Sequence, residues 1–153
     1  MTNEINDPPA DFTHAWVALG LMGFMQLIYI LLAHFMQEGV QQAAIDEGER
    51  EIIRGVFYVL AIVMFPMTNL IRHIKLRLNE TMPSDKSLNQ RYLLTVIVSQ
   101  GLIASVGVFG FVMFMLGDGF NTLYIFSTLA FLGLFLHRPK YDEYQSLTIE
   151  PHD

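Results

Sequence analysis

Residues 92–136 read YLLTVIVSQGLIASVGVFGFVMFMLGDGFNTLYIFSTLAFLGLFL, and Asp118 is the one charged residue among them. The apolar parts before and after Gly117-Asp118-Gly119 cover residues 92–116 and 120–136. Each is long enough for a helix that crosses the roughly 30 Å hydrocarbon core of a membrane, although the second is near the lower limit. The glycines permit the left-handed backbone angles of a tight turn. The stretch therefore predicts two antiparallel membrane-spanning helices.

Two further apolar stretches, residues 12–36 and 52–71, precede this hairpin. A chain inside lipid must satisfy its own backbone hydrogen bonds, which favours helices. The sequence is 52% hydrophobic and only 16% charged. We therefore predict an all-α, integral membrane four-helix bundle that forms a single domain over residues 1–153. The second helix is expected to continue past the membrane through Leu78 and to kink at Pro66.

The distribution of Lys and Arg predicts the orientation of this bundle, because cytoplasmic loops carry the excess of both. The other side of the membrane has only Arg50 and Arg54, and the predicted cytoplasmic side has Arg72, Lys75, Arg77, Lys86, Arg91, Arg138 and Lys140. The loop 72–91 and an acidic C-terminal tail, 141–153, are thus expected in the cytoplasm. Four spans place the N-terminus there too.

Composition also argues against several functions. The sequence has no Cys, which rules out disulfides and thiolate ligands. It has no basic stripe with interleaved aromatics, so nucleic-acid binding is not expected. Phosphate-binding, Ser-His-Asp and zinc-binding patterns are absent, and we expect no enzymatic activity, metal or obligatory cofactor. The small size and the lack of a recognisable targeting peptide favour a bacterial inner membrane.

Small residues recur in the third span and predict a face where another helix can approach closely. Gly101 and Ser105 are four residues apart, and Ala104, Gly107 and Gly110 follow one another at every third position. One interpretation is packing inside the bundle, for which Gly20 and Gly23 of the first span are the expected partners. The other is contact with another subunit.

The same stretch, SQGLIASVGVFGFVMF at residues 99–114, resembles the ion-binding helix of rotary ATPase c subunits. That helix has small residues around a Leu, then a Glu followed by Ser or Ala, and then an apolar run with Tyr-Gly or Phe-Gly. The stretch is also similar to the third helix of small bacterial four-span membrane proteins. The likeness covers about 20 of 153 residues. Ala104 stands where the carboxylate of c subunits would be, so the resemblance does not imply a proton or sodium site.

Polar side chains inside the spans are the next candidates. Gln26, Asn69 and Gln100 are amides within apolar stretches, and no Asp, Glu or Lys is expected at mid-depth. Coupled ion transport usually requires such a charged residue. The amides are therefore expected to form hydrogen bonds between helices, with a polar ligand site as the alternative.

Three histidines, His14, His73 and His137, are expected near the cytoplasmic boundary. Two of them on facing helices could ligate a haem iron. The alternative is anchoring at headgroup depth, which the neighbouring Arg72, Lys75 and Arg138 favour.

The leading functional hypothesis is a non-catalytic accessory or structural subunit of a larger membrane complex. Its partners would be membrane lipids and either other membrane subunits or further copies of itself. One alternative is a small transporter or channel that diverged from c-subunit-like proteins. The other is an electron-transfer membrane subunit that holds haem or quinone near the inner face.

Overall fold

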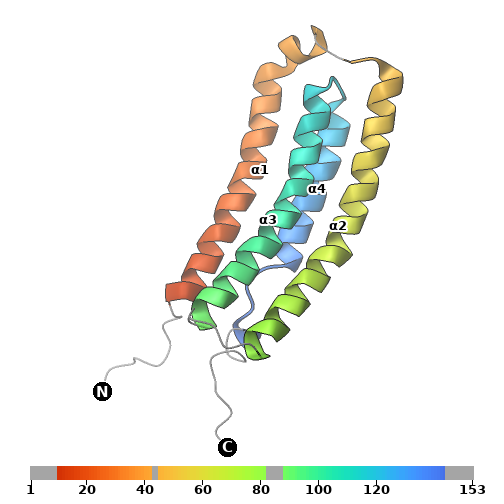
Figure 1. Cartoon of the computed structure of the whole chain (residues 1–153). Coiled ribbons are helices and arrows are strands. Elements are labelled where there is room, and N and C mark those ends of the chain that lie inside the picture. Colours follow the sequence, from red (N-terminus) through yellow and green to blue (C-terminus); the bar gives the residue numbers. More distant parts are fainter. Residues whose placement is uncertain (1–9, 43–44, 82–87, 144–153) are drawn as a thin grey trace, which may run out of the picture.

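The computed structural model describes residues 10–42, 45–81 and 88–143. Four long helices form a bundle: α1 (Ala10–Gln42), α2 (Glu47–Thr81), α3 (Leu88–Met115) and α4 (Phe120–Leu136) (Figure 1). No strand occurs in these described ranges, and the predicted all-α class is confirmed. The tail expected at 141–153 is described only up to Glu143, and residues 82–87 of the loop at 72–91 lie outside the described residues.

Helix α3 is the centre of the bundle, because it packs against each of the other three helices. Helices α1 and α2 lie on opposite sides of the α3–α4 hairpin (Figure 1). The main apolar cluster joins α2, α3 and α4 through Ala61, Val106 and Phe126, and the ring of Tyr58 stacks on that of Phe126 with centroids 4.8 Å apart. Helix α1 packs on α3 in two separate clusters, through Ala15 near one end and Ala33 near the other.

The turn between α3 and α4 follows the expected glycine chemistry. Gly117 has φ 89°, a left-handed angle that costs other residues about 1–2 kcal/mol. The N–H groups of Gly117 and Asp118 donate to the carbonyl oxygens of Phe114 and Met113 at 2.9 and 3.0 Å. These bonds satisfy carbonyl groups that the end of α3 would otherwise leave free.

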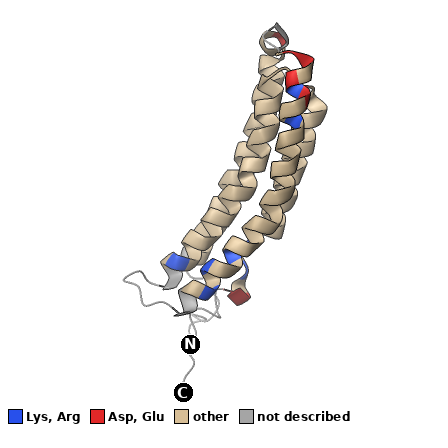
Figure 2. Cartoon of the chain, turned by 45° about the vertical axis from the view of Figure 1, so that its right-hand side comes forward, with Lys and Arg blue, Asp and Glu red and all other residues tan. Residues whose placement is uncertain are grey.

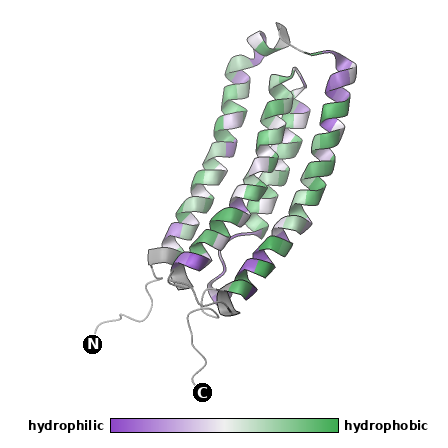
Figure 3. Ribbon diagram, in the orientation of Figure 1, coloured by the Kyte–Doolittle hydropathy of each residue, from purple (hydrophilic) through white to green (hydrophobic). Residues whose placement is uncertain are grey.

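Among the described residues, Lys, Arg, Asp and Glu lie at the two ends of the bundle (Figure 2), and hydrophobic residues dominate the middle (Figure 3). Three helices are long and apolar enough to cross a membrane, over Phe12–Val40, Glu47–Leu78 and Gln90–Met115, and α4 is a shorter apolar helix. Large apolar side chains such as Phe24, Phe35 and Ile62 remain exposed on α1 and α2. This pattern is consistent with an integral membrane protein, in which lipid tails cover such faces.

The helices extend beyond the apolar stretches that predict them. Helix α1 continues to Gln42, and α2 begins at Glu47. Most of the polar stretch between the first two apolar stretches, residues 37–51, where a loop is the simplest expectation, is therefore helical. Asp46 accepts a hydrogen bond from the N–H of Gly48 at 3.1 Å, and Glu47 and Glu49 lie in the first turn of α2, where negative charge complements the helix dipole. Helix α2 is not interrupted at Pro66. At its other end it continues past Leu78 to Thr81, which agrees with the expected extension beyond the apolar stretch.

Candidate functional site

A polar cluster at one end of the bundle joins α2 to the segment that follows α4. Arg72 is only 6% exposed. Its Nη1 donates to the carbonyl oxygen of His137 at 2.8 Å, and its Nη2 donates to Glu143 Oε2 at 2.6 Å. A second bond from Nη2 reaches the carbonyl oxygen of Arg138 at 3.3 Å. The guanidinium therefore fixes the path of the chain after α4.

The same segment is also bonded to α3 and contacts α1. The hydroxyl of Tyr92 donates to the carbonyl oxygen of Lys140 at 3.0 Å and accepts from the backbone N–H of Lys140 at 3.1 Å. The ring of Tyr141 meets that of Phe12 edge to face, with centroids 5.4 Å apart. Residues 137–143 thus connect all the helices at this end of the bundle.

His137 is fully engaged inside this cluster. It is 3% exposed, its Nε2 is 2.9 Å from Asn69 Oδ1, and its Nδ1 is 2.9 Å from the carbonyl oxygen of Gly133. Burial lowers the pKa of His137 below its usual value, and the positive charges of Arg72 and Lys140 lower it further. The bond to the Gly133 carbonyl and the charge of Glu143 oppose this shift. The lowered pKa favours the neutral imidazole, whose single N–H donates from Nδ1 to the carbonyl oxygen of Gly133. Nε2 is then an acceptor, so the side-chain amide of Asn69 is turned with its NH₂ group toward the ring. His137 acts as a bridge between α2 and α4.

These contacts bear on the haem hypothesis. A haem iron needs a free imidazole nitrogen, whereas both nitrogens of His137 are in hydrogen bonds. His73 is exposed and lies with His137 around one cavity, and His14 is exposed on α1. Within the described ranges, no group of three or more His, Cys, Asp or Glu side chains could hold a metal ion.

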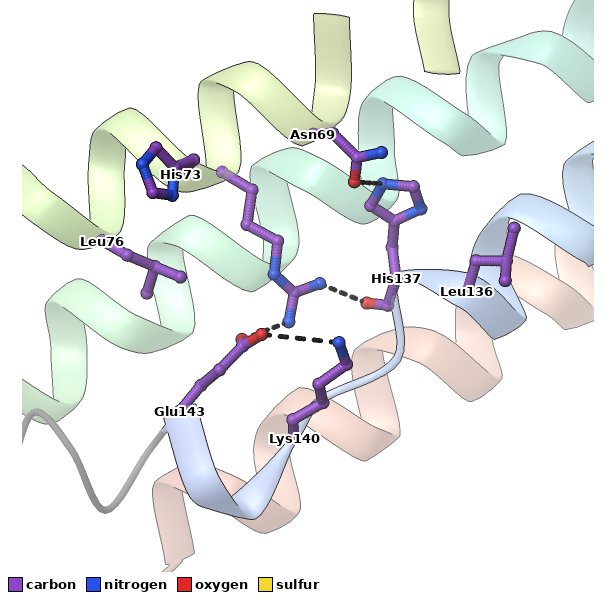
Figure 4. A pocket seen from close by; sticks show the side chains of 8 residues that line it. Asn69, His73, Leu76, Leu136, His137, Lys140 and Glu143 are labelled. Carbon is purple, nitrogen blue, oxygen red and sulfur yellow. Dashed lines mark hydrogen bonds and ion pairs between the residues drawn. The ribbon is translucent and has the colours of Figure 1, made fainter. Parts of the chain in front are cut away.

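A cavity of about 190 Å³ opens between α2 and the end of α4 at this cluster (Figure 4). Leu76 and Leu136 form its apolar part. Its polar part is formed by Asn69, Arg72, His73, His137, Lys140 and Glu143. The Nε of Arg72 is buried without a hydrogen-bond partner. Lys140 Nζ lies 3.8 Å from Glu143 Oε1, so this lysine is only loosely held. The cavity thus offers one cationic donor, the Lys140 ammonium, that the chain itself does not saturate.

The opposite end has a second, smaller set of charge contacts. Arg54 pairs with Asp118 at 3.3 Å, and Arg50 Nη1 donates to the carbonyl oxygen of Gly117 at 3.1 Å. Both bonds hold the start of α2 against the turn between α3 and α4. Arg50, Arg54 and Asp118 therefore have a structural role at this end.

A groove of about 240 Å³ lies between α1 and α3, in the apolar middle of the bundle. Its lining consists of Met22, Met25, Gln26, Tyr29, Gly101, Ala104, Ser105 and Val108. Gln26 is 1% exposed and donates through Nε2 to the carbonyl oxygen of Ala104 at 3.0 Å, so it forms a hydrogen bond between helices. Its Oε1 is buried without a partner.

The small residues of α3 face two different helices. At Gly107 an added Cβ would collide with the side-chain amide of Gln26 on α1. At Gly110 it would lie 2.7 Å from the Cβ of Phe126 on α4. At Gly101 it would have only Met22 Cε, 4.0 Å away. The closest approaches on α3 are therefore internal to the bundle, and Gly101 borders the open groove.

The expected partners on α1 lie elsewhere. A Cβ at Gly20 would meet nothing within 4 Å, and one at Gly23 would lie 3.7 Å from Phe131 on α4. Neither glycine lies where α1 and α3 are in closest contact, because that contact is made by the side chain of Gln26 against Gly107. Hydropathy does not define how two apolar helices are rotated about their axes, which explains the difference.

The remaining amides differ in environment. Asn69, expected at mid-depth, instead belongs to the polar cluster through its bond to His137. Gln100 is fully buried, and neither its Oε1 nor its Nε2 has a partner; the same is true of Ser127 Oγ on α4. The hydrogen bond between helices that was expected of each amide is thus formed by Gln26 but not by Gln100.

Four residues of these sites were not predicted: Arg72 as a buried anchor, Tyr92, Glu143, and Gly133, whose added Cβ would collide with Ile103. Arg72 and His137 are both at the expected cytoplasmic boundary, and this shared depth is the one sequence feature that indicates a contact between them. No sequence feature indicated that the tail would fold back on α2 and α3.

The fold and these contacts define a class: a helical bundle with an apolar middle, polar ends and three helices that are long enough to cross a membrane. Comparison with known proteins found no matching family model, no matching curated protein and no matching solved structure.

Proposed function

We propose that the chain is a non-catalytic accessory subunit of a larger complex in a bacterial inner membrane. The observation that carries this proposal is the groove between α1 and α3. Its floor contains Gly101, Ala104 and Ser105, residues small enough for the backbone of another membrane helix to approach closely. The occupant would be a helix of another subunit or of a second copy.

The use of the polar residues supports the same proposal. Arg72, Tyr92 and His137 are engaged in contacts that hold the chain together, and Arg54 and Asp118 do the same at the other end. These groups have a structural role, which leaves the apolar exterior as the surface for interaction. In the proposed orientation, the end with Arg72 and Lys140 faces the cytoplasm, as do both chain termini.

Extraction in mild detergent followed by size measurement tests this function. The native chain should elute in an assembly larger than a monomer. Gly101→Leu should dissociate it by filling the groove, whereas Gly55→Leu, at an α2 glycine with nothing within 4 Å of an added Cβ, should leave it intact. Unfolding of both variants should match the native chain. A monomeric native chain, or an assembly indifferent to Gly101→Leu in a folded variant, contradicts the proposal.

A small transporter or channel is a second candidate, and Gln100 is the observation that favours it. A fully buried amide with two unpartnered atoms costs stability unless water or a polar solute satisfies it. Flux of water or a small polar solute into liposomes, lost in Gln100→Leu, would support this candidate. Liposomes with no flux above the lipid background would remove it.

A further inference from the structure

The cavity between α2 and the end of α4 lies where the apolar band of the bundle meets its charged end. Arg72 and Lys140 contribute two positive charges to its wall, and Glu143 contributes one negative charge. His137 adds none, because burial keeps its imidazole neutral. The wall therefore has an excess of positive charge before any ligand is present.

A donor for an anion remains available in this wall. The Nη atoms of Arg72 are occupied by two carbonyl oxygens and by Glu143, and its Nε is buried, so Arg72 contributes its charge. Lys140 is 55% exposed in its side chain, and its ammonium is 3.8 Å from Glu143. An ammonium has three donors, so most of its capacity is unused. The exposed imidazole of His73 borders the same space.

The rest of the cavity is apolar. Leu76 and Leu136 line it, and the exposed side chains of Leu132, Phe135 and Leu136 continue from it along the outside of α4. Leu132 and Leu136 are four residues apart and so lie on one face of that helix. A ligand with an anionic head and an apolar tail would match both parts of this surface.

We propose that this cavity binds the phosphodiester headgroup of an anionic membrane phospholipid. The phosphate oxygens would accept hydrogen bonds from the Lys140 ammonium, next to the positive charge of Arg72, and an acyl chain would lie along the exposed apolar face of α4. Basic pockets between membrane helices recognise anionic lipids in this way. The site is on α2 and α4, away from the groove between α1 and α3, and so it does not depend on the proposed subunit role.

Titration of the purified full-length chain in neutral detergent with short-chain phosphatidylglycerol tests the proposal, with thermal unfolding as the readout. Phosphatidylcholine with the same acyl chains and inorganic phosphate at equal ionic strength are the other two probes. Phosphatidylglycerol should raise the unfolding temperature in a saturable manner. Phosphatidylcholine should give a smaller shift, because its headgroup carries a cation, and inorganic phosphate should not compete, because it lacks the apolar part.

Three variants locate the site. Lys140→Gln should weaken phosphatidylglycerol binding about fivefold, the effect of one basic residue near an anionic lipid. Glu143→Gln should strengthen binding, because it removes the carboxylate that competes for Arg72 and Lys140. Lys75→Gln is the matched control, since it removes the same charge from the same end of the bundle but outside the cavity, and it should weaken binding by no more than about twofold.

Three results would overturn the proposal. Equal binding of the two lipids would remove the preference for an anionic headgroup. Equal losses in Lys140→Gln and Lys75→Gln would show attraction to the basic end as a whole in place of a defined site. Displacement of phosphatidylglycerol by inorganic phosphate would show a site for free anions.

Discussion

The side-chain oxygen of Gln26 on α1 occupies the space that a Cβ atom would need at Gly107 on α3. Because Gly107 has no side chain, the amide of Gln26 can pack against the backbone of α3. The bond from Gln26 Nε2 to the carbonyl oxygen of Ala104 lies at the same place. Glycine at this point in a helix is explained by this contact.

Gly107→Ala should therefore destabilise the chain, although alanine is the better helix former. The added methyl group forces the buried amide of Gln26 to move, and overpacking of this kind costs about 1–3 kcal/mol. Denaturant-induced unfolding in mixed micelles measures the loss. Gly55→Ala, at an open position of α2, should not destabilise the chain.

A double variant checks the cause of that loss. Gln26→Ala removes the amide that the new methyl group would meet, so adding Gly107→Ala to it should cost clearly less than in the native chain. A full, additive cost in the double variant would mean that the contact with Gln26 is not the reason.

Arg72→Gln should release the segment after α4. Its shorter side chain cannot serve the carbonyl oxygens of His137 and Arg138 and the carboxylate of Glu143 together. Acceptors left buried without partners cost about 1–3 kcal/mol each. Limited proteolysis should cleave near residues 138–143 much faster than in the native chain. Lys75→Gln serves as the control, and equal cleavage in both variants would contradict the anchoring role.

Stability should fall in mild acid because of His137. Its pKa is lowered in the folded chain, mainly by burial and also by Arg72 and Lys140, so the unfolded chain binds the proton more readily. The stability from the neutral imidazole is fully present above the unfolded pKa of about 6.5 and is lost as the pH falls through the folded pKa. Unfolding measured at pH 7.5 and 5.5 should show this decrease, and His137→Gln should reduce it. A decrease of the same size in His137→Gln would assign the effect to other groups.

The turn between α3 and α4 gives a test of backbone geometry. Gly117 has φ 89°, and Gly119 has φ −73° with open space around it. Gly117→Ala should cost about 1–2 kcal/mol of unfolding free energy, because its new side chain crowds a left-handed backbone. Gly119→Ala should be close to neutral in the same unfolding assay. Equal effects would show that the turn tolerates either conformation.

The all-α class could be predicted from the sequence because long uncharged stretches leave few alternatives in lipid. Helix α4 covers the same residues, 120–136, as the expected fourth span. The ends of α1 and α2 were less predictable. The last turn of α1 and the first turn of α2 are polar. The former is helical because it continues a formed helix, and the latter is capped by Asp46.

The candidate sites were only partly predictable, for a physical reason. Helices such as α3 and α4 are apolar on every side, so their sequences do not show which face meets which neighbour. The meeting of Gln26 with Gly107, and of Gly23 with Phe131, depends on that rotation. The cluster of Arg72, His137 and Glu143 depends on where the chain turns after α4, and no periodic pattern encodes that turn.

We infer that these helices cross a membrane, with the acidic start of α2 and its basic end on opposite sides. The sequence has no Cys, so single-cysteine variants report position without background. Glu47→Cys and His73→Cys place the thiol at exposed positions near the two ends of α2. In intact cells, a membrane-impermeant maleimide should label Glu47→Cys at once and His73→Cys only after the membrane is opened. Labelling of both variants from the same side would contradict the account.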